Sequence, residues 1–131
     1  MIRGFTLALL LLLGLTLAGC VDHDDGIPPA LAGLHQRAAA GDASAQLDLG
    51  LRYVTGRGIK PDEQTAVRWI GKAAAQSNAA AQFELGSDYT LEPHRDFGRA
   101  APLLRQSALQ GFASAQTRLA MLHLAGAEAK P

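Results

Sequence analysis

The chain has 131 residues, and its 12 basic and 12 acidic side chains leave a formal net charge of zero. This length suffices for one small domain, and the even charge balance provides no positive field that would attract nucleic acid. Hydrophobic residues make up 48% of the sequence, but many of them lie in one N-terminal run. The remainder is rich in alanine, which favours helices. We therefore expect a small helical domain without a nucleic-acid partner.

The first 19 residues have the features of an export signal. Arg3 precedes an apolar run of about 13 residues from Phe5 to Leu17, whereas a membrane-spanning helix needs about 20. Small residues follow this run, and an acidic stretch begins at Asp22. We predict that residues 1–19 form a cleaved signal peptide, with an uncleaved anchor as the less favoured alternative.

Leu17, Ala18, Gly19 and Cys20 together resemble the lipobox of bacterial lipoproteins. The resemblance implies cleavage before Cys20 and a lipid on its sulfur, and two or more acyl chains anchor a protein stably. The residue after that cysteine is Val21 rather than an aspartate, which implies the periplasmic face of the outer membrane. An ordinary signal with a buried cysteine is the alternative. Cys20 is the only cysteine, so no internal disulfide can form.

Residues 20–29 are predicted to form a flexible tether. They include three aspartates, one glycine and two prolines, without apolar periodicity. His23 stands among these aspartates, but a mobile segment cannot hold a coordination geometry. We therefore predict no metal and no cofactor here.

Beyond the tether the sequence repeats itself. Ala45-Gln46 recurs as Ala81-Gln82 and as Ala115-Gln116, so the period is 34 to 36 residues. A second set of recurring positions lies between these, each member four residues before a small residue: Leu34, Trp69 and Leu103.

Each repeat contains two helical patterns. In the first, Ala45, Leu49 and Tyr53 form one stripe, and Gly50 beside them allows another helix to approach closely. In the second, Asp62 can cap a helix whose apolar positions recur at helical spacing. The segment "TGRGIKP" between them supplies a turn, so each unit is an antiparallel helix pair. One pair cannot bury both of its apolar stripes, so successive pairs must stack into an all-α solenoid.

The segment "AQLDLGLRYVTGRGIKPDEQTAVRWIGKAA" resembles the Sel1-like repeat family, a branch of the tetratricopeptide superfamily with a longer turn. The resemblance covers residues 30–126 and implies a right-handed α-solenoid of about two and a half to three repeats. We expect six helices, of which the first is a partial one near residues 30–40 and the two end helices act as caps. Residues 127–131 are predicted to be a tail.

Pro102 is unusual because it stands six positions after Asp96, the expected cap of the fifth helix. A proline there removes a backbone hydrogen bond and crowds the preceding turn. Two interpretations are open: the helix is kinked, or it starts later than Asp96 indicates.

The binding surface is predicted on the concave side, which the first helix of each pair lines. We expect it to comprise Leu47, Asp48, Leu51, Phe83, Glu84, Ser87, Arg118 and Met121. Such a strip would fit a segment with an apolar face and mixed charge. The alternative is that its apolar members pack partly on opposing helices while its charges solvate the surface.

Other conspicuous residues favour structural roles. The three recurring glutamines are expected to satisfy a carbonyl in the adjacent loop, although they could also bind a peptide backbone. Trp69 belongs to the core by its phase. His35, His94 and His123 share no spacing that would hold a metal, and we expect them at the surface or at an interface.

No nucleophile and base are placed to act together, so we predict that the protein is not an enzyme and has no small-molecule substrate. The leading hypothesis is a lipid-anchored adaptor that holds another envelope protein by its concave face. The alternative is a periplasmic inhibitor or immunity protein that occludes an envelope-directed toxin.

Overall fold

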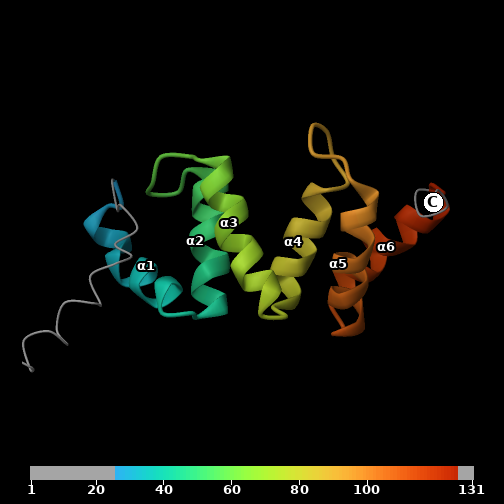
Figure 1. The fold of residues 1–131 in the computed structure, drawn as a ribbon, viewed down its shortest axis with the longest axis horizontal. Helices are drawn as coiled ribbons and strands as arrows, with labels where there is room; N and C mark the ends of the chain where they lie inside the picture. The colour runs from blue at the N-terminus through green and yellow to red at the C-terminus, as the bar shows by residue number, and fades with distance from the viewer. Residues whose placement is uncertain (1–25, 127–131) are drawn as a thin grey trace, which may run out of the picture.

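The computed structural model describes residues 26–126. Their helices lie side by side in chain order, with the N-terminal and C-terminal helices at opposite ends of the row (Figure 1). A short 3-10 helix, η1, precedes six α-helices, and the described residues contain no strand. Their bounds are η1 Pro29–Leu31, α1 Ala32–Ala39, α2 Ala43–Thr55, α3 Glu63–Ala75, α4 Ala79–Asp88, α5 Phe97–Leu109 and α6 Ala113–Leu124. The predicted all-α solenoid with six helices is confirmed. The predicted signal peptide, Cys20, most of the tether and the tail lie outside the described residues.

Four of these helices are capped at their N-termini by a polar side chain. Asp42 accepts hydrogen bonds from two backbone N–H groups of α2, and Asn78 accepts one in α4. The two caps expected from the sequence, Asp62 and Asp96, do the same for α3 and α5. Two hydrogen bonds from Thr65 lower the pKa of the Asp62 carboxyl group. The bond from the Thr65 hydroxyl contributes most, and the bond from its backbone N–H follows.

The turn between α2 and α3 depends on left-handed backbone, as the sequence predicts. Gly56 and Gly58 have φ values of 70° and 76°. The shorter turns between pairs need the same conformation at one position. Gly41 and Gly111 occupy it with φ of 101° and 86°, whereas Ser77 takes it with φ of 62° between α3 and α4.

Within each pair a glycine lets the two helices touch. A Cβ atom on Gly50 would lie 2.5 Å from Ile70 Cγ1 and 3.1 Å from the backbone oxygen of Ala66. A Cβ on Gly86 would lie 2.9 Å from Leu104 Cγ. The close approach predicted from the sequence is therefore present in both complete pairs.

The core consists of three successive clusters along the row. The first joins α1, α2 and α3 around Leu49 and Trp69, so the predicted core position of Trp69 is confirmed. The second joins α3 to α4 around Ile70, with side chains of α2 packed against it. The third joins α5 and α6 around Leu104 and Leu122, with side chains of α4 packed against it. Each helix pair thus covers its neighbour.

The repeated glutamines tie consecutive helices together. Their side-chain amides donate to the carbonyl oxygen eight residues earlier, from Gln46 to Ala38 at 3.0 Å and from Gln82 to Ala74 at 3.3 Å. Gln116 repeats the contact to Ala108 at 3.2 Å. The expected role is confirmed with one correction: the carbonyl belongs to the last turn of the preceding helix and not to the connecting loop.

Pro102 lies inside α5, which begins directly after its cap Asp96. The interpretation that this helix starts later is therefore wrong. Pro102 has no N–H to donate to the carbonyl of Gly98, four residues earlier, and Pro102 itself is exposed to solvent. Among residues 26–126, no helix has the length and apolar character needed to cross a membrane.

Candidate functional site

A cavity lies where the first helix pair meets the second. It has a volume of about 510 Å³ and is lined by α2, α3 and α4 together with the turns at their ends. In Figure 1, α3 and α4 diverge toward the edge that carries the two longer turns, and the pocket occupies this divergence. We call it the junction pocket. Its volume is in the range of pockets that accept a few side chains or a small ligand.

Apolar side chains form most of the wall. Ile70 and Val67 come from α3, and Leu51 comes from α2. Val54 of α2 and Leu91 of the turn after α4 also line the pocket, and they remain 57% and 56% exposed. Covering their exposed apolar surface would favour contact with a partner.

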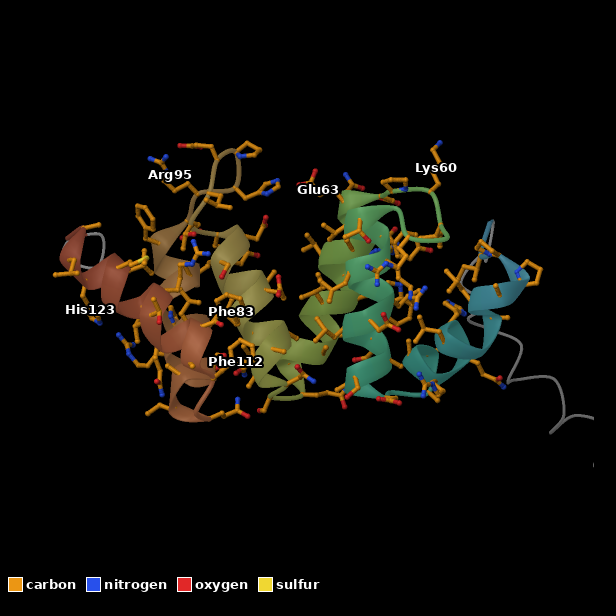
Figure 2. The ribbon with its side chains drawn as sticks, turned by 180° about the vertical axis from the view of Figure 1, so that it is seen from behind. Lys60, Glu63, Phe83, Arg95, Phe112 and His123 are labelled. Carbon is orange, nitrogen blue, oxygen red and sulfur yellow. The ribbon has the colours of Figure 1, made fainter. Side chains whose placement is uncertain are left out.

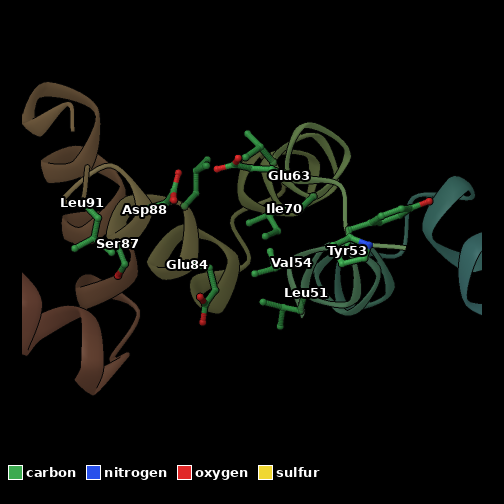
Figure 3. A pocket seen from close by; sticks show the side chains of 13 residues that line it. Leu51, Tyr53, Val54, Glu63, Ile70, Glu84, Ser87, Asp88 and Leu91 are labelled. Atoms are coloured by element: carbon green, nitrogen blue, oxygen red, sulfur yellow. The ribbon is translucent and has the colours of Figure 1, made fainter. Parts of the chain in front are cut away.

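The charged side chains that line the pocket are all acidic: Glu63, Glu84 and Asp88. Figure 3 shows the carboxylates of Glu63 and Asp88 on one side of the opening and that of Glu84 on the other. The whole chain is neutral, so this acidic lining is a local feature rather than a reflection of composition.

His94 connects two of these carboxylates across the junction. Its Nε2 lies 3.3 Å from Glu63 Oε1, and its Nδ1 lies 3.2 Å from Asp88 Oδ2. A neutral imidazole has one N–H and can donate to only one of the two, whereas a protonated ring can donate to both. The turn between α4 and α5 is thereby linked to the start of α3. The sequence predicts His94 at the surface or at an interface, and its side chain is partly exposed, at 36%.

Glu84 is half-buried on α4. Burial raises the pKa of its carboxyl group, and the positive charge of Arg118 on α6 opposes this shift only in part. The ionised form of Glu84 is therefore less favourable in the folded chain than in water.

The structure distributes the eight residues of the predicted binding surface over different environments. Leu51, Glu84 and Ser87 line the junction pocket. Leu47 packs partly on the second core cluster. Phe83 packs on the third and lies against Phe112, with ring centroids 5.2 Å apart (Figure 2). Leu51 also packs partly on the second core cluster, so for all three apolar residues the alternative of partial packing describes what is seen.

The remaining members of that surface lie outside the pocket. Asp48 is exposed and pairs with Arg52 of its own helix at 3.2 Å. Arg118 acts on Glu84 through its charge. Met121 is 58% exposed on α6. The binding role of the eight residues as one surface stays a prediction.

Several pocket residues carry no signal in the sequence pattern. Glu63, Asp88 and Leu91 lie at helix ends or in a turn, outside the stripes that repeat along the chain. One signal could have identified two of them. The positions 34 residues later hold Phe97 and Leu122, so Glu63 and Asp88 are acidic where the next repeat is apolar.

Comparison with known proteins gives a consistent result. The family model described as Sel1 repeat matches residues 43–78, 79–112 and 113–131. No curated protein matches the chain. A protective antigen of uropathogenic Escherichia coli that displays an SLR fold is 34% identical, with a TM-score of 0.70 over 73% of this chain and 21% of that one. A Sel1 repeat protein from Oxalobacter formigenes is 31% identical, with a TM-score of 0.67 over 74% of both chains. The chain thus spans about a fifth of the first structure and about three quarters of the second.

Proposed function

Because this chain belongs to the Sel1 repeat family, we propose that it is a cell-envelope adaptor that holds another protein on the face that carries the junction pocket. Sel1 repeats are in general protein-interaction modules, and their fold is typically a scaffold without catalytic activity. The observation that supports this face most is the junction pocket itself. Two of its apolar lining residues, Val54 and Leu91, are more than half exposed, and Leu51 and Glu84 of the predicted binding surface also line it.

The envelope location is part of the same proposal. It is supported by the N-terminal sequence alone, in which Cys20 ends a lipobox-like segment after an apolar run. A lipid on Cys20 and the short tether would keep the helices close to the membrane surface. We expect the mature protein to fractionate with membranes and its N-terminal peptide to carry the mass of acyl chains. Cys20→Ser should release the protein, and a wild-type chain found only in soluble fractions would argue against anchoring.

Photocrosslinking in intact cells tests the adaptor role. A photoreactive amino acid is placed at Val54, on the pocket opening, and in a second strain at Leu109 as the control. Leu109 is 82% exposed on α5 and does not line the pocket, so the control position is at least as accessible as Val54 and differs in place. We expect a discrete crosslinked protein from position 54 and none from position 109. Equal products from both positions, or none from position 54, would contradict the proposal.

The identity of the crosslinked protein also separates the adaptor from the inhibitor. A member of an envelope assembly agrees with the adaptor. A wall-degrading or lipid-degrading enzyme that loses activity when this protein is added would make it an inhibitor.

A further inference from the structure

We propose that the junction pocket binds a protein segment in which a lysine or arginine stands beside apolar side chains. This inference rests on the proposed function and specifies the chemistry of the partner. The basic group would lie among Glu63, Asp88 and Glu84, and the apolar side chains would cover Val54 and Leu91 and contact Ile70 below them. An exposed segment of another protein can supply both the basic group and the apolar side chains.

Charge is the first argument for such a partner. Three carboxylates from α3 and α4 line the pocket, and the residues that line it include no lysine or arginine. Arg118 acts on Glu84 from α6 and compensates for this charge only in part. His94 faces Glu63 and Asp88 through its two ring nitrogens. A partner that brought a further acidic group would meet like charges, whereas a basic side chain would complement them.

Apolar contact is the second argument. Val54 and Leu91 are more than half exposed, so covering them removes apolar surface from water. Leu51, Val67 and Ile70 continue this surface into the pocket. The partner must therefore offer apolar side chains close to its basic group, which a highly charged tail would not do.

The state of Glu84 supports the same conclusion. Burial makes its ionised carboxylate unfavourable, and Arg118 compensates only in part. An approaching cation would stabilise the ionised form, so binding would relieve a cost that the free protein carries.

His94 leaves hydrogen-bonding capacity for a ligand at this site. Because a neutral ring satisfies only one of the two carboxylates it faces, the other can accept a hydrogen bond from the ligand. A lysine or arginine would then complete the set of partners around Glu63 and Asp88.

A peptide library displayed on phage and selected on the purified full chain tests the inference. We expect the selected peptides to combine a basic residue with neighbouring leucine-like residues. A synthetic copy of the strongest peptide is then measured by fluorescence anisotropy. Its affinity should fall about tenfold in Glu63→Gln or Glu84→Gln, since each removes one charge from the basic group's surroundings.

Matched variants isolate the pocket from general effects. Glu92→Gln removes a carboxylate that pairs with Arg95 in the turn after α4 and does not line the pocket, so it should leave the affinity unchanged. Leu91→Ser should weaken binding about tenfold, whereas Leu109→Ser should have no effect. Leu91 and Leu109 are both largely exposed, so these changes leave the core intact.

Three results would overturn the inference: selection of peptides without basic residues, binding that ignores the pocket variants, or no selected peptide at all. The crosslinking experiment distinguishes these from failure of the adaptor role. A crosslink from position 54 to a protein that lacks a basic and apolar segment at the contact leaves the adaptor standing and removes this inference. Absence of that crosslink removes the adaptor itself.

Discussion

The two junctions between helix pairs are built on the same repeat, and two of the positions at which they differ matter most here. At the first, between α3 and α4, Glu63 and Asp88 stand with His94 at the edge of a pocket. At the second, between α5 and α6, the equivalent residues are Phe97 and Leu122. Leu122 is 6% exposed in the third core cluster, and Phe97 packs against that cluster. The fold therefore needs neither carboxylate, and the second junction shows what packing alone prefers.

This difference indicates that the first junction is adapted to a purpose other than stability. At the first junction Glu63 and Asp88 line a pocket, whereas at the second Leu122 belongs to the third core cluster and Phe97 packs against it. Natural proteins depart from consistent packing chiefly at functional sites. The comparison thus supports the placement of a binding site at the first junction. Exchanging residues between the two junctions tests this placement.

The largest effect is expected when the acidic residue is moved to the second junction. Leu122→Asp places a carboxylate in the third core cluster without a partner there and should lower the free energy of unfolding by about 3 kcal/mol or more. Asp88→Leu, the reverse change at the first junction, should be neutral or stabilising. Urea unfolding followed by circular dichroism measures both. Similar losses in the two variants would show that the junctions do not differ as described.

Within the helix pairs, by contrast, the two halves are alike, and the glycine contacts should be equally intolerant. Gly50→Ala should destabilise the chain by about 1–3 kcal/mol, because the new Cβ would meet Ile70 Cγ1 at 2.5 Å and the backbone of α3. Gly33→Ala in α1 is the control, since no atom lies within 4 Å of its Cβ position. It should stabilise slightly through helix propensity. A neutral Gly50→Ala would refute the close approach of α2 and α3.

The glutamine in the middle of the array is more buried and makes more hydrogen bonds than the one at its end. Gln82 is buried, donates to Ala74 and Gln106, and accepts from Gln110, whereas Gln116 is exposed and makes one such bond to Ala108. Gln82→Ala should cost about 1–3 kcal/mol because it leaves buried polar groups unpaired. Gln116→Ala should cost less than about 1 kcal/mol. Thermal unfolding of the two variants provides the comparison, and equal losses would contradict it.

A smaller gain is expected in the turn that enters α4. Ser77 adopts φ of 62°, where its equivalents Gly41 and Gly111 avoid any side-chain strain. Ser77→Gly should raise the free energy of unfolding by about 0.5–1 kcal/mol, since relief of strain exceeds the added freedom of the unfolded chain. Differential scanning calorimetry of the two proteins measures this gain. A loss of stability would mean that Ser77 is not strained.

The smallest effect concerns the pH dependence of stability through Glu84. Its pKa is raised on folding, so the folded chain holds this proton more tightly than the unfolded chain does. The corresponding stability is fully present below the unfolded pKa and is lost as the pH rises through the folded pKa. Glu84→Gln should remove this loss and stabilise the chain by less than about 1 kcal/mol near neutral pH. Unfolding curves over the acidic range measure it, and an unchanged pH profile would contradict the role of burial.

The sequence predicts the fold well and the site only in part, for a physical reason. Helix pairs leave periodic marks, so the caps Asp62 and Asp96, the contact at Gly50 and the core position of Trp69 all follow from spacing. Side chains whose environment depends on how two pairs diverge leave no such mark. Phe83 has the phase of a surface residue, yet it packs against Phe112 because α6 lies beside α4.

The pocket was missed for the same reason. Glu63 starts α3, Asp88 ends α4, and His94 stands in the turn that follows, so no single period connects them. Only the difference from Phe97 and Leu122 in the next repeat marks two of these positions. Within repeat proteins, departures from the repeat thus indicate sites more directly than the repeat itself.

One double variant tests most directly whether the first junction gives up packing in order to bind. Glu63→Phe with Asp88→Leu gives it the residues of the second junction. We predict that the free energy of unfolding rises while the affinity for the selected basic and apolar peptide falls at least about tenfold. A variant that is less stable than the natural chain, or that binds the peptide as before, would contradict this view of the junction.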